Sequence, residues 1–378
     1  MDYIKFLKYV NLEDHRIDDL LSLSSHNGPY YDEETKVRLL SHYIIAYCKF
    51  SKVKDTERFN QLILSMAQEL CDEKYRPDGY TFLCRMGNKK DKTNGVIGQA
   101  WVIEALVELY VYFGEGKYLD LAKRIFLMHP YDSKIGGWHC VSIEGKIMPC
   151  DMTFNHQLWF AAAGAMINAV DETKEVRKCL VQFMDKLESN LKTHRNGLIV
   201  HKLKPCNFVD KVKFDLKQIR DFLRRKVDKP NMKYKEIGYH SFNLYGFALL
   251  KAYYGDHTFF ESSKFKKAML YSNTKEYFTG LRNSMHGVDI NSKNMSQCNV
   301  KCNRYAYSYN VTGLEMVYIY KILGKYNLLK EETVNSLFNE QLKYTYNKVK
   351  GSFDNTEDDV IVNARIYELL RAYEVKDV

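Results

Sequence analysis

Segments that are apolar on most faces alternate along this chain with segments that carry a single apolar stripe. A helix that is apolar all round is buried, whereas a helix with one stripe lies at the surface. The all-round apolar segments are Lys36–Phe50, Gly95–Phe113, Thr153–Ala169, His240–Tyr254, Asn310–Leu323 and Val360–Tyr373. The striped segments between them are Thr56–Cys71, Lys117–Leu127, Thr173–Leu191, Ser262–Leu270 and Glu331–Tyr346, and a further partner is expected within Asp2–Leu21.

Two concentric rings of helices explain this alternation, because inner helices contact neighbours on all sides and outer helices meet water. The sequence therefore predicts an all-α fold, an (α/α)6 toroid. A helical-repeat solenoid is disfavoured, since the spacing between helices is uneven. Long loops are expected at 73–93, 128–152, 193–237 and 275–305, with short β pieces within 138–148 and at Gly197–His201. Only six prolines and no linker-like stretch indicate a single domain over residues 1–378.

The net charge of +9 is densest between Lys202 and Lys235. Such a cluster attracts an anionic partner such as an acidic sugar, or forms a solvated face, which is the preferred interpretation. Nucleic-acid binding is not expected, because no recognised binding motif accompanies the charge. The N-terminus is charged where a signal peptide would be apolar, and no uninterrupted apolar run reaches about 18 residues, so no membrane span is expected. With nine scattered cysteines, these features predict a cytoplasmic protein.

Polar and aromatic residues gather where the apolar helices begin. Buried polar atoms are costly unless they are paired, so several helices that carry them at one end indicate a shared pocket. The residues at these helix mouths are Gln99 and Trp101; Asp151, Asn155, His156 and Trp159; His240 and Asn243; Tyr309; and Arg365.

The segment around Asp151 carries the strongest pattern. Asn155 and Trp159 follow Asp151 by four and eight residues, which places all three on one helix face. A carboxylate, an amide and an aromatic plate suit a sugar ring, whose hydroxyls need hydrogen bonds and whose C–H face stacks on indole. Asp151 either caps the helix or acts as a general acid/base. Both hold only if one carboxylate oxygen caps and the other faces substrate.

Further candidates have a structural alternative. Trp138 and His139 lie on a loop, where binding residues often occur. His240 is most simply a hydrogen-bonded core residue, although with His139 and His156 it could share one cavity. Arg365 could bind a substrate carboxylate.

The preferred interpretation of Arg365 is an ion pair with Glu368 or Glu315, and Glu104 is likewise expected in an ion pair. Cys298 and Cys302 lack a second Cys/His pair nearby, so no metal site is expected. Phosphate-loop, nucleophile-elbow and dinucleotide motifs are absent from the sequence. We therefore expect chemistry without a cofactor.

The chain resembles the six-hairpin, (α/α)6-toroid carbohydrate enzymes in three motifs. These are Gly-Gln-Ala-Trp101, Gly-Gly-Trp138-His139 and Asp151-Met-Thr-Phe-Asn-His-Gln157. It is also similar to hydrolase-like proteins of surface-polysaccharide and archaeal N-glycosylation clusters. The resemblance to unsaturated glucuronyl hydrolases implies that Asp151 protonates the sugar's vinyl-ether bond and activates water. Those enzymes use a second aspartate, for which the sequence offers no equivalent. The resemblance to N-acylglucosamine 2-epimerases implies proton transfer by His156 and His240.

The sequence thus predicts a glycoside hydrolase for an anionic, uronic-acid-type saccharide. Asp151 is the expected general acid/base, with a pKa raised by a water-poor pocket. In this hypothesis Asn155, His156 and Gln99 position hydroxyls, the three tryptophans stack on the ring, and His240 and Arg365 contact the anionic group. One alternative is a cofactor-free sugar epimerase or isomerase that uses His156 and His240. Another is a non-catalytic glycan-binding protein.

Overall fold

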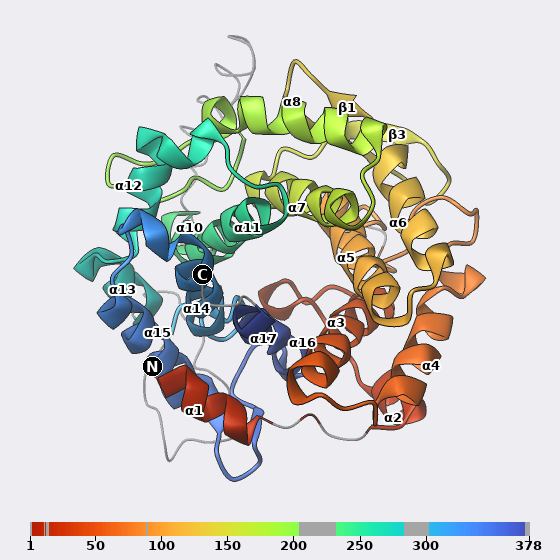
Figure 1. The fold of residues 1–378 in the computed structure, drawn as a ribbon, viewed down its shortest axis with the longest axis horizontal. Helices are drawn as coiled ribbons and strands as arrows, with labels where there is room; N and C mark the ends of the chain where they lie inside the picture. Colours follow the sequence, from red (N-terminus) through yellow and green to blue (C-terminus); the bar gives the residue numbers. More distant parts are fainter. Residues whose placement is uncertain are drawn as a thin grey trace.

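A ring of inner helices surrounds the centre of the protein (Figure 1). The structure is a computed structural model that describes residues 2–10, 12, 15–87, 90–203, 232–282 and 302–374. The inner helices are α3 (Val37–Lys54), α5 (Gly95–Phe113), α7 (Phe154–Val170), α11 (His240–Tyr253), α14 (Thr312–Leu323), and the pair α16 (Asp359–Ala364) and α17 (Tyr367–Glu374). Each packs against the next, and α17 returns to α3, which closes the ring.

A second layer covers this ring from outside (Figure 1). Its helices are α1 (Asp2–Tyr9), α2 (Ile17–Ser22), α4 (Asn60–Leu70), α6 (Gly116–Met128), α8 (Lys174–Asn190), α12 (Ser263–Tyr271), α13 (Lys275–Arg282) and α15 (Glu331–Thr345), while α10 (Met232–Gly238) leads into α11. The predicted all-α (α/α)6 toroid is confirmed. The expected helix over Gly95–Phe113 has these same bounds in the structure.

The last inner segment differs from its predicted form, because it is two helices rather than one. The helical path is interrupted at Arg365 and Ile366, between α16 and α17. This break frees Arg365 from a regular helix and turns its side chain to carboxylates on two elements, Glu315 and Glu368.

Short antiparallel strands occupy some of the long loops. β1 (Tyr131–Asp132), β2 (Gly137–Val141) and β3 (Ile147–Cys150) form a three-stranded sheet, and β4 (Tyr346–Asn347) pairs with β5 (Ser352–Phe353). The β structure expected within 138–148 is therefore confirmed. The segment Gly197–His201 is not a strand, because within it only Ile199 pairs, through an isolated bridge to Thr193.

The inner helices are buried on nearly every face, as their sequences require. In α5 every residue from Gly95 to Leu109 is buried. Gly164 of α7 lies against the ring of Phe126, where a Cβ atom would collide with it. Among the described residues, α5 is the one helix long and apolar enough to cross a membrane, but 78% of that stretch is buried within the protein. Core helices commonly meet the same criterion.

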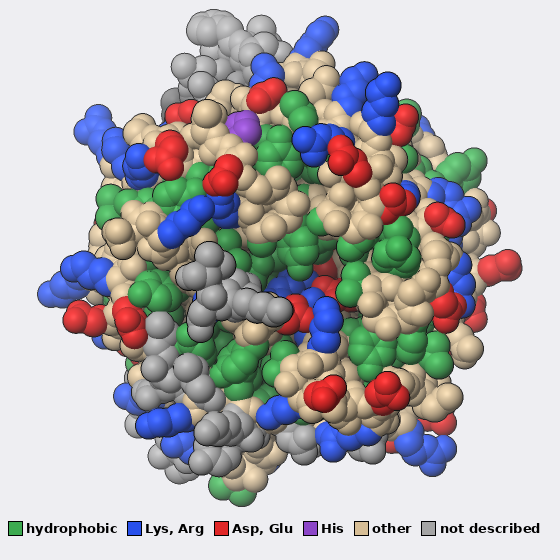
Figure 2. Space-filling model, in the orientation of Figure 1, with side chains coloured by type: hydrophobic (Ala, Val, Ile, Leu, Met, Phe, Trp, Pro, Cys, Tyr) green, Lys and Arg blue, Asp and Glu red, His purple; other side chains and the backbone are tan. Residues whose placement is uncertain are grey.

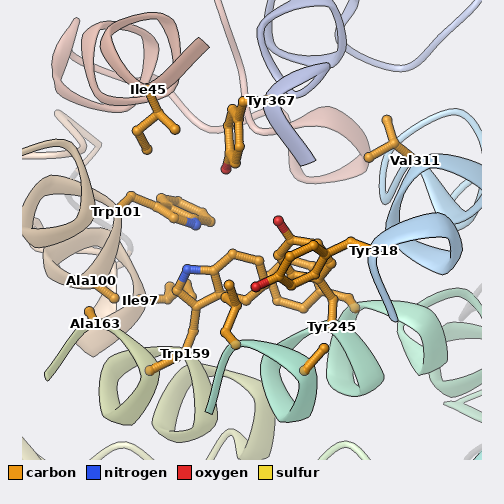
Figure 3. Packing of buried hydrophobic residues seen from close by; sticks show 14 of the residues in the cluster. Ile45, Ile97, Ala100, Trp101, Trp159, Ala163, Tyr245, Val311, Tyr318 and Tyr367 are labelled. Atoms are coloured by element: carbon orange, nitrogen blue, oxygen red, sulfur yellow. The ribbon is translucent and has the colours of Figure 1, made fainter. Parts of the chain in front are cut away.

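A buried polar network spans the middle of the ring. Arg371 of α17 forms an ion pair with Glu104 of α5, and both side chains are essentially inaccessible to solvent. Glu104 also accepts a hydrogen bond from Trp159 Nε1 of α7 at 3.0 Å, and Arg371 donates to the Tyr245 hydroxyl of α11 at 3.1 Å. The ion pair expected for Glu104 is thus present. Figure 3 shows Trp101, Trp159, Tyr245 and Tyr367 directed from these helices toward a common centre.

Replacing Glu104 by Gln leaves the Arg371 charge buried without its main partner. We expect this to lower the free energy of unfolding by about 3–5 kcal/mol, as is usual when one member of a buried pair is removed. Urea denaturation followed by circular dichroism measures the loss. Arg177→Ala, which removes a solvent-exposed pair with Glu172, is the control and should change stability by less than about 1 kcal/mol. Equal losses in both variants would contradict a central role for the pair.

Candidate active site

A cavity of about 460 Å³ lies among the mouths of the inner helices. Its size falls within the range of small-molecule sites, roughly 300–1,000 Å³. Aromatic walls come from Trp101, Trp159, Phe242 and Tyr367 on four inner helices. Figure 2 shows one face of the ring, with Lys, Arg, Asp and Glu side chains among hydrophobic ones around its centre. The fold therefore brings helix mouths from distant parts of the chain to one hollow.

Buried polar atoms without partners are concentrated on this cavity. Five residues that line it each carry one side-chain atom with no hydrogen-bond partner in the described part of the chain: Arg38 Nε, His42 Nε2, Asn155 Oδ1, His201 Nδ1 and Glu368 Oε2. Buried polar atoms in native proteins are nearly always satisfied, so each exception calls for an explanation. Five such atoms around one cavity are the mark of a site built for a polar ligand.

His156 is held at the cavity edge by Asp151. Its Nδ1 lies 2.7 Å from Asp151 Oδ2, and its side chain is 26% exposed. Because an ionised carboxylate only accepts hydrogen bonds, Nδ1 carries the hydrogen and Nε2 is the atom free to exchange a proton. This arrangement is the one that orients a catalytic imidazole in acyl-transfer triads.

Asp151 itself lies behind His156 rather than on the cavity wall. Its Oδ1 accepts the backbone N–H of Thr153 at 2.9 Å, while its Oδ2 holds His156. Because Thr153 is the N-cap residue of α7, Asp151 supports the turn before this helix, and its predicted role as the helix N-cap is wrong. Burial alone would raise the pKa of this carboxyl. The charge and hydrogen bond of His156, with the Thr153 N–H and Lys202, outweigh burial and hold the pKa below its ordinary value. The expected raised pKa is wrong for this reason.

A close backbone approach fixes this dyad. Gly95, the first residue of α5, has a φ of +60°, and a Cβ atom there would collide with Asp151 Oδ2. Asp151 Oδ2 also lies 3.4 Å from the backbone nitrogen of Val96. Only glycine satisfies both the left-handed conformation and the space. The start of α5 and the imidazole of α7 are therefore positioned together.

Two further histidines line the cavity and are held neutral. His42 Nδ1 lies 3.1 Å from the Tyr367 hydroxyl, and its ring packs on Trp101. Burial, reinforced by Arg38, Arg365 and Arg371, lowers its pKa well below the ordinary value. Burial together with Lys235 and Lys202 does the same for His201. A neutral imidazole keeps one ring nitrogen with a lone pair that can accept a proton or a hydrogen bond.

The carboxylates on the cavity wall are engaged with cations. Asp32 pairs with Arg85 and Lys90, and Asp91 pairs with Arg85 at 2.7 Å. Glu368 accepts from Arg365 Nε at 2.7 Å through Oε1 alone. Burial, opposed by Arg365, raises the pKa of Glu368 to about 7.

Arg365 lines the cavity, and each of its three nitrogens already makes one hydrogen bond within the protein. Besides Glu368 it bonds Glu315 at 2.8 Å and the backbone oxygen of Tyr309 at 2.6 Å. The expected ion pairs with Glu368 and Glu315 are therefore present. The alternative role, contact with a substrate carboxylate, would fall to the second N–H group of each terminal nitrogen, because a guanidinium has five N–H donors.

The structure brings half of the predicted site residues together. Those that line the cavity are Trp101, Asn155, His156, Trp159, Tyr309 and Arg365. Gln99 does not reach it, because its amide bonds the backbone of Phe82 and the Thr93 carbonyl and so anchors a loop.

Trp138 and His139, the two candidates predicted on a loop, also lie outside the cavity. Trp138 is fully buried in a cluster of aromatic rings with Phe126, Phe160 and Phe183, between inner and outer helices. His139 bonds the Met148 carbonyl and lies 3.5 Å from Asp132, away from the cavity. Their positions correct the prediction that they bind substrate.

His240 and Asn243 are packing residues of α11. His240 Nε2 bonds the Ala268 carbonyl at 3.0 Å, and burial lowers its pKa to about 4. Asn243 donates to the Tyr239 carbonyl at 2.8 Å. Neither lines the cavity, so the predicted catalytic role of His240 is wrong and the core interpretation holds. Most of the basic cluster between Lys202 and Lys235, and Cys298, lie outside the described residues.

Sequence reasoning missed His42, His201, Lys235 and Tyr239, which all line the cavity. His42 lies inside an apolar helix and His201 follows a β-like segment, so neither sits at a predicted helix mouth. For His42, the one available signal was that it is a polar side chain within an otherwise apolar inner helix. As for metals, the described residues contain no cluster of three or more His, Cys, Asp or Glu that could hold an ion.

Solved structures of other proteins share this (α/α)6-toroid fold. The cellobiose 2-epimerase of Bacillus thermoamylovorans B4167 superimposes with a TM-score of 0.62 at 13% identity, covering 99% of this chain and 98% of that one. A sugar epimerase from a ruminal bacterium gives 0.63 at 14% identity, covering all of both chains. A family 76 glycoside hydrolase from a Bacteroides thetaiotaomicron strain gives 0.55 at 10% identity, over 99% and 77%.

A relative of similar sequence shows the family to which the chain belongs. The chain is 30% identical over 361 residues to archaeal glycosylation protein Q of Haloferax volcanii, which covers 92% of this chain and 91% of that protein. The chain therefore belongs to the family of archaeal glycosylation protein Q. No family model matches the sequence.

The neutral state of His42 predicts how stability depends on pH. Its folded-state pKa is depressed, so below about pH 6.5 the unfolded chain binds a proton that the folded protein does not. Stability should therefore fall as the pH drops from 7.5 to 5, with His42 contributing up to about 1.4 kcal/mol per pH unit. Urea titrations at several pH values should give a smaller slope for His42→Gln. An unchanged slope, or the same change in His139→Gln, would contradict the assignment.

Proposed function

We propose that the protein is a carbohydrate-active enzyme that transfers a proton on a saccharide bound in the cavity, as a sugar epimerase or isomerase does. The observation that carries this proposal is the convergence of an Asp151-oriented imidazole and two neutral imidazoles on one aromatic-walled hollow. Its family member is a glycosylation protein, and solved structures with this fold include sugar epimerases. These similarities support a sugar substrate.

The walls of the cavity match the chemistry of a sugar ring. Trp101, Trp159 and Phe242 give the cavity an aromatic wall, in which the rings of Trp159 and Phe242 stack on each other with centroids 4.3 Å apart. Asn155 Oδ1, which has no partner in the described residues, can accept a hydroxyl hydrogen. Satisfying such buried atoms contributes to binding, because each is costly when left unpaired.

We assign the proton transfer to the imidazoles of His42 and His156. In the proposed reaction neutral His42 takes a proton, through Nε2, from the carbon beside the carbonyl of an open-chain sugar. The C–H electron pair moves to form an enediolate, and the carbonyl oxygen takes the negative charge. His156, protonated and held by Asp151, returns a proton to carbon. Delivery to the opposite face gives the epimer, and solvent exchange restores both histidines.

Cations near the cavity complement this chemistry. Arg38 lines the wall and packs over Trp101 at 5.2 Å, with its Nε free of a partner among the described residues. A fixed positive charge at a developing oxyanion stabilises the transition state more than the ground state. Arg38 is thus our candidate for stabilising the enediolate.

Glycoside hydrolysis, the reaction expected from the sequence, is the second candidate, and one observation favours it. Glu368 has one unpartnered oxygen on the cavity and a pKa raised to about 7, as a general acid needs. In this case Glu368 rather than Asp151 would protonate the glycosidic oxygen. The pairing of Asp32 and Asp91 with cations leaves the cavity wall without a free second carboxylate, which weighs against the mechanism with two carboxylates.

Isotope exchange separates these reactions. The protein is incubated with neutral and acidic free sugars and oligosaccharides, once in D2O and once in H2¹⁸O, and products are analysed by mass spectrometry and NMR. Epimerisation should place deuterium on the carbon beside the carbonyl without bond cleavage. Hydrolysis would instead place ¹⁸O at a new reducing end. Saccharide binding with neither label incorporated would refute catalysis and favour a glycan-binding protein.

Histidine variants test the assigned roles. His156→Gln and His42→Gln should each lower kcat by about 10²- to 10⁴-fold, the usual contribution of an acid/base group. His139→Gln is a matched control, because His139 also lies beside an aspartate but outside the cavity. It should keep nearly full activity, with similar thermal midpoints for all three variants. A His156 variant that turns over at more than about a hundredth of the normal rate would remove this residue from the mechanism.

A further inference from the structure

One lysine at the cavity has no acidic partner within the described part of the chain. The Nζ atom of Lys235, on α10, lies 5.0 Å from the ring centre of Tyr30, 5.6 Å from that of Tyr239 and 5.9 Å from that of Tyr305. Its side chain is half-buried and lines the cavity. Within the described ranges it forms no hydrogen bond or ion pair. Aromatic faces stabilise an ammonium, but they do not neutralise its charge.

The surroundings of Lys235 are positive rather than compensating. Lys202, whose Nζ donates to Thr153 Oγ1 at 3.0 Å, and Lys90 both line the same cavity. The carboxylates there are engaged elsewhere, since Asp32 holds Lys90 and Arg85, and Asp91 holds Arg85. Burial, with the charges of Lys202 and Lys90, lowers the pKa of Lys235 to about 8.

The adjacent acid does not supply the missing charge. Glu236, the next residue of α10, accepts from His194 Nε2 at 2.8 Å and from the His201 backbone at 3.1 Å. It is therefore committed to the segment that carries His201. A partly buried cation without a counter-ion is unfavourable, and its persistence in the wall of a cavity points to a ligand that brings the opposite charge.

We propose that Lys235, together with Lys202, forms an anion subsite that binds a carboxylate or phosphate group carried by the saccharide. This inference rests on the proposed function in taking the ligand to be a sugar. It replaces His240 and Arg365, the residues first expected to contact the anion, since His240 is away from the cavity and the charge of Arg365 is already paired with Glu315 and Glu368.

Calorimetric titration with three sugars tests the subsite. The probes are glucuronate, glucose 6-phosphate and neutral glucose, at pH 7 and low ionic strength. Either anion, or both, should bind more tightly than glucose, and their ranking distinguishes a carboxylate from a phosphate site. Lys235→Gln should weaken the preferred anion by about 10- to 100-fold, as expected for one charged hydrogen bond, and leave glucose unchanged. Lys235→Arg should retain most of the preference.

The control variant is Lys233→Gln. Lys233 lies two residues away on the same helix, and its exposed side chain pairs with Glu276 at 2.8 Å. This change removes the same formal charge without altering the cavity wall, so anion affinity should stay near the wild-type value. Equal weakening by both variants would show a general charge effect and overturn the subsite.

Proton uptake supplies an independent readout. Bound anion favours the charged ammonium and so raises the pKa of Lys235. Binding at pH 8, measured in buffers of different ionisation enthalpy, should therefore take up a fraction of a proton, and Lys235→Gln should abolish that fraction. Uptake that persists in this variant would assign the proton to another facing group, such as His201 or Lys202, and overturn the role of Lys235.

The failure of this inference is distinguishable from failure of the proposed reaction. If deuterium exchange occurs but the anions bind no better than glucose, the anion subsite is refuted and the proposed proton-transfer reaction is still supported. If the anions bind through Lys235 but no isotope is incorporated, the subsite stands and catalysis is refuted.

Discussion

The ion pair between Glu104 and Arg371 is the interaction on which the rest of the ring depends. It joins α5 to the last helix, α17, and through Trp159 and Tyr245 it reaches α7 and α11. These groups are almost completely excluded from solvent, so the charges stay compensated only while four helices hold their relative positions. Trp159 is also a wall of the cavity. The ion pair that spans the middle of the ring thus also holds one wall of the cavity in place.

Asp151 and His156, the proposed acid/base groups, are likewise held in place by contacts between helices. Asp151 is fixed by the Thr153 N–H and by the close approach of Gly95, and it in turn fixes His156. The imidazole is therefore aligned by backbone conformation at two helix starts rather than by a mobile loop. Sites held by regular elements keep their geometry more precisely than sites on loops. Such rigidity suits a reaction in which a proton moves between fixed donors and acceptors.

Much of the fold could be predicted from the sequence, because burial on all faces or on one face is written directly into helix periodicity. The site was only partly predictable. Positions along a helix showed that Asn155 and Trp159 share a face, but not whether a polar residue points to the ring centre or to the outer layer. His240 and Trp138 point outward, and Gln99 serves a loop. His42 and Lys235 reach the cavity through the closure of the ring, which no local pattern encodes.

The edge of the cavity joins segments that are far apart in the sequence. The Tyr30 hydroxyl lies 2.7 Å from that of Tyr239, and the Tyr309 hydroxyl donates to Asn27 Oδ1 at 2.6 Å, across 209 and 282 residues of sequence. Chains emerge from the ribosome N-terminus first, and contacts this distant in sequence cannot form until both partners have been synthesised. The edge of the cavity is therefore completed late in translation, and a nascent chain that ends before Tyr309 can form the earlier helices but cannot make the contact with Asn27.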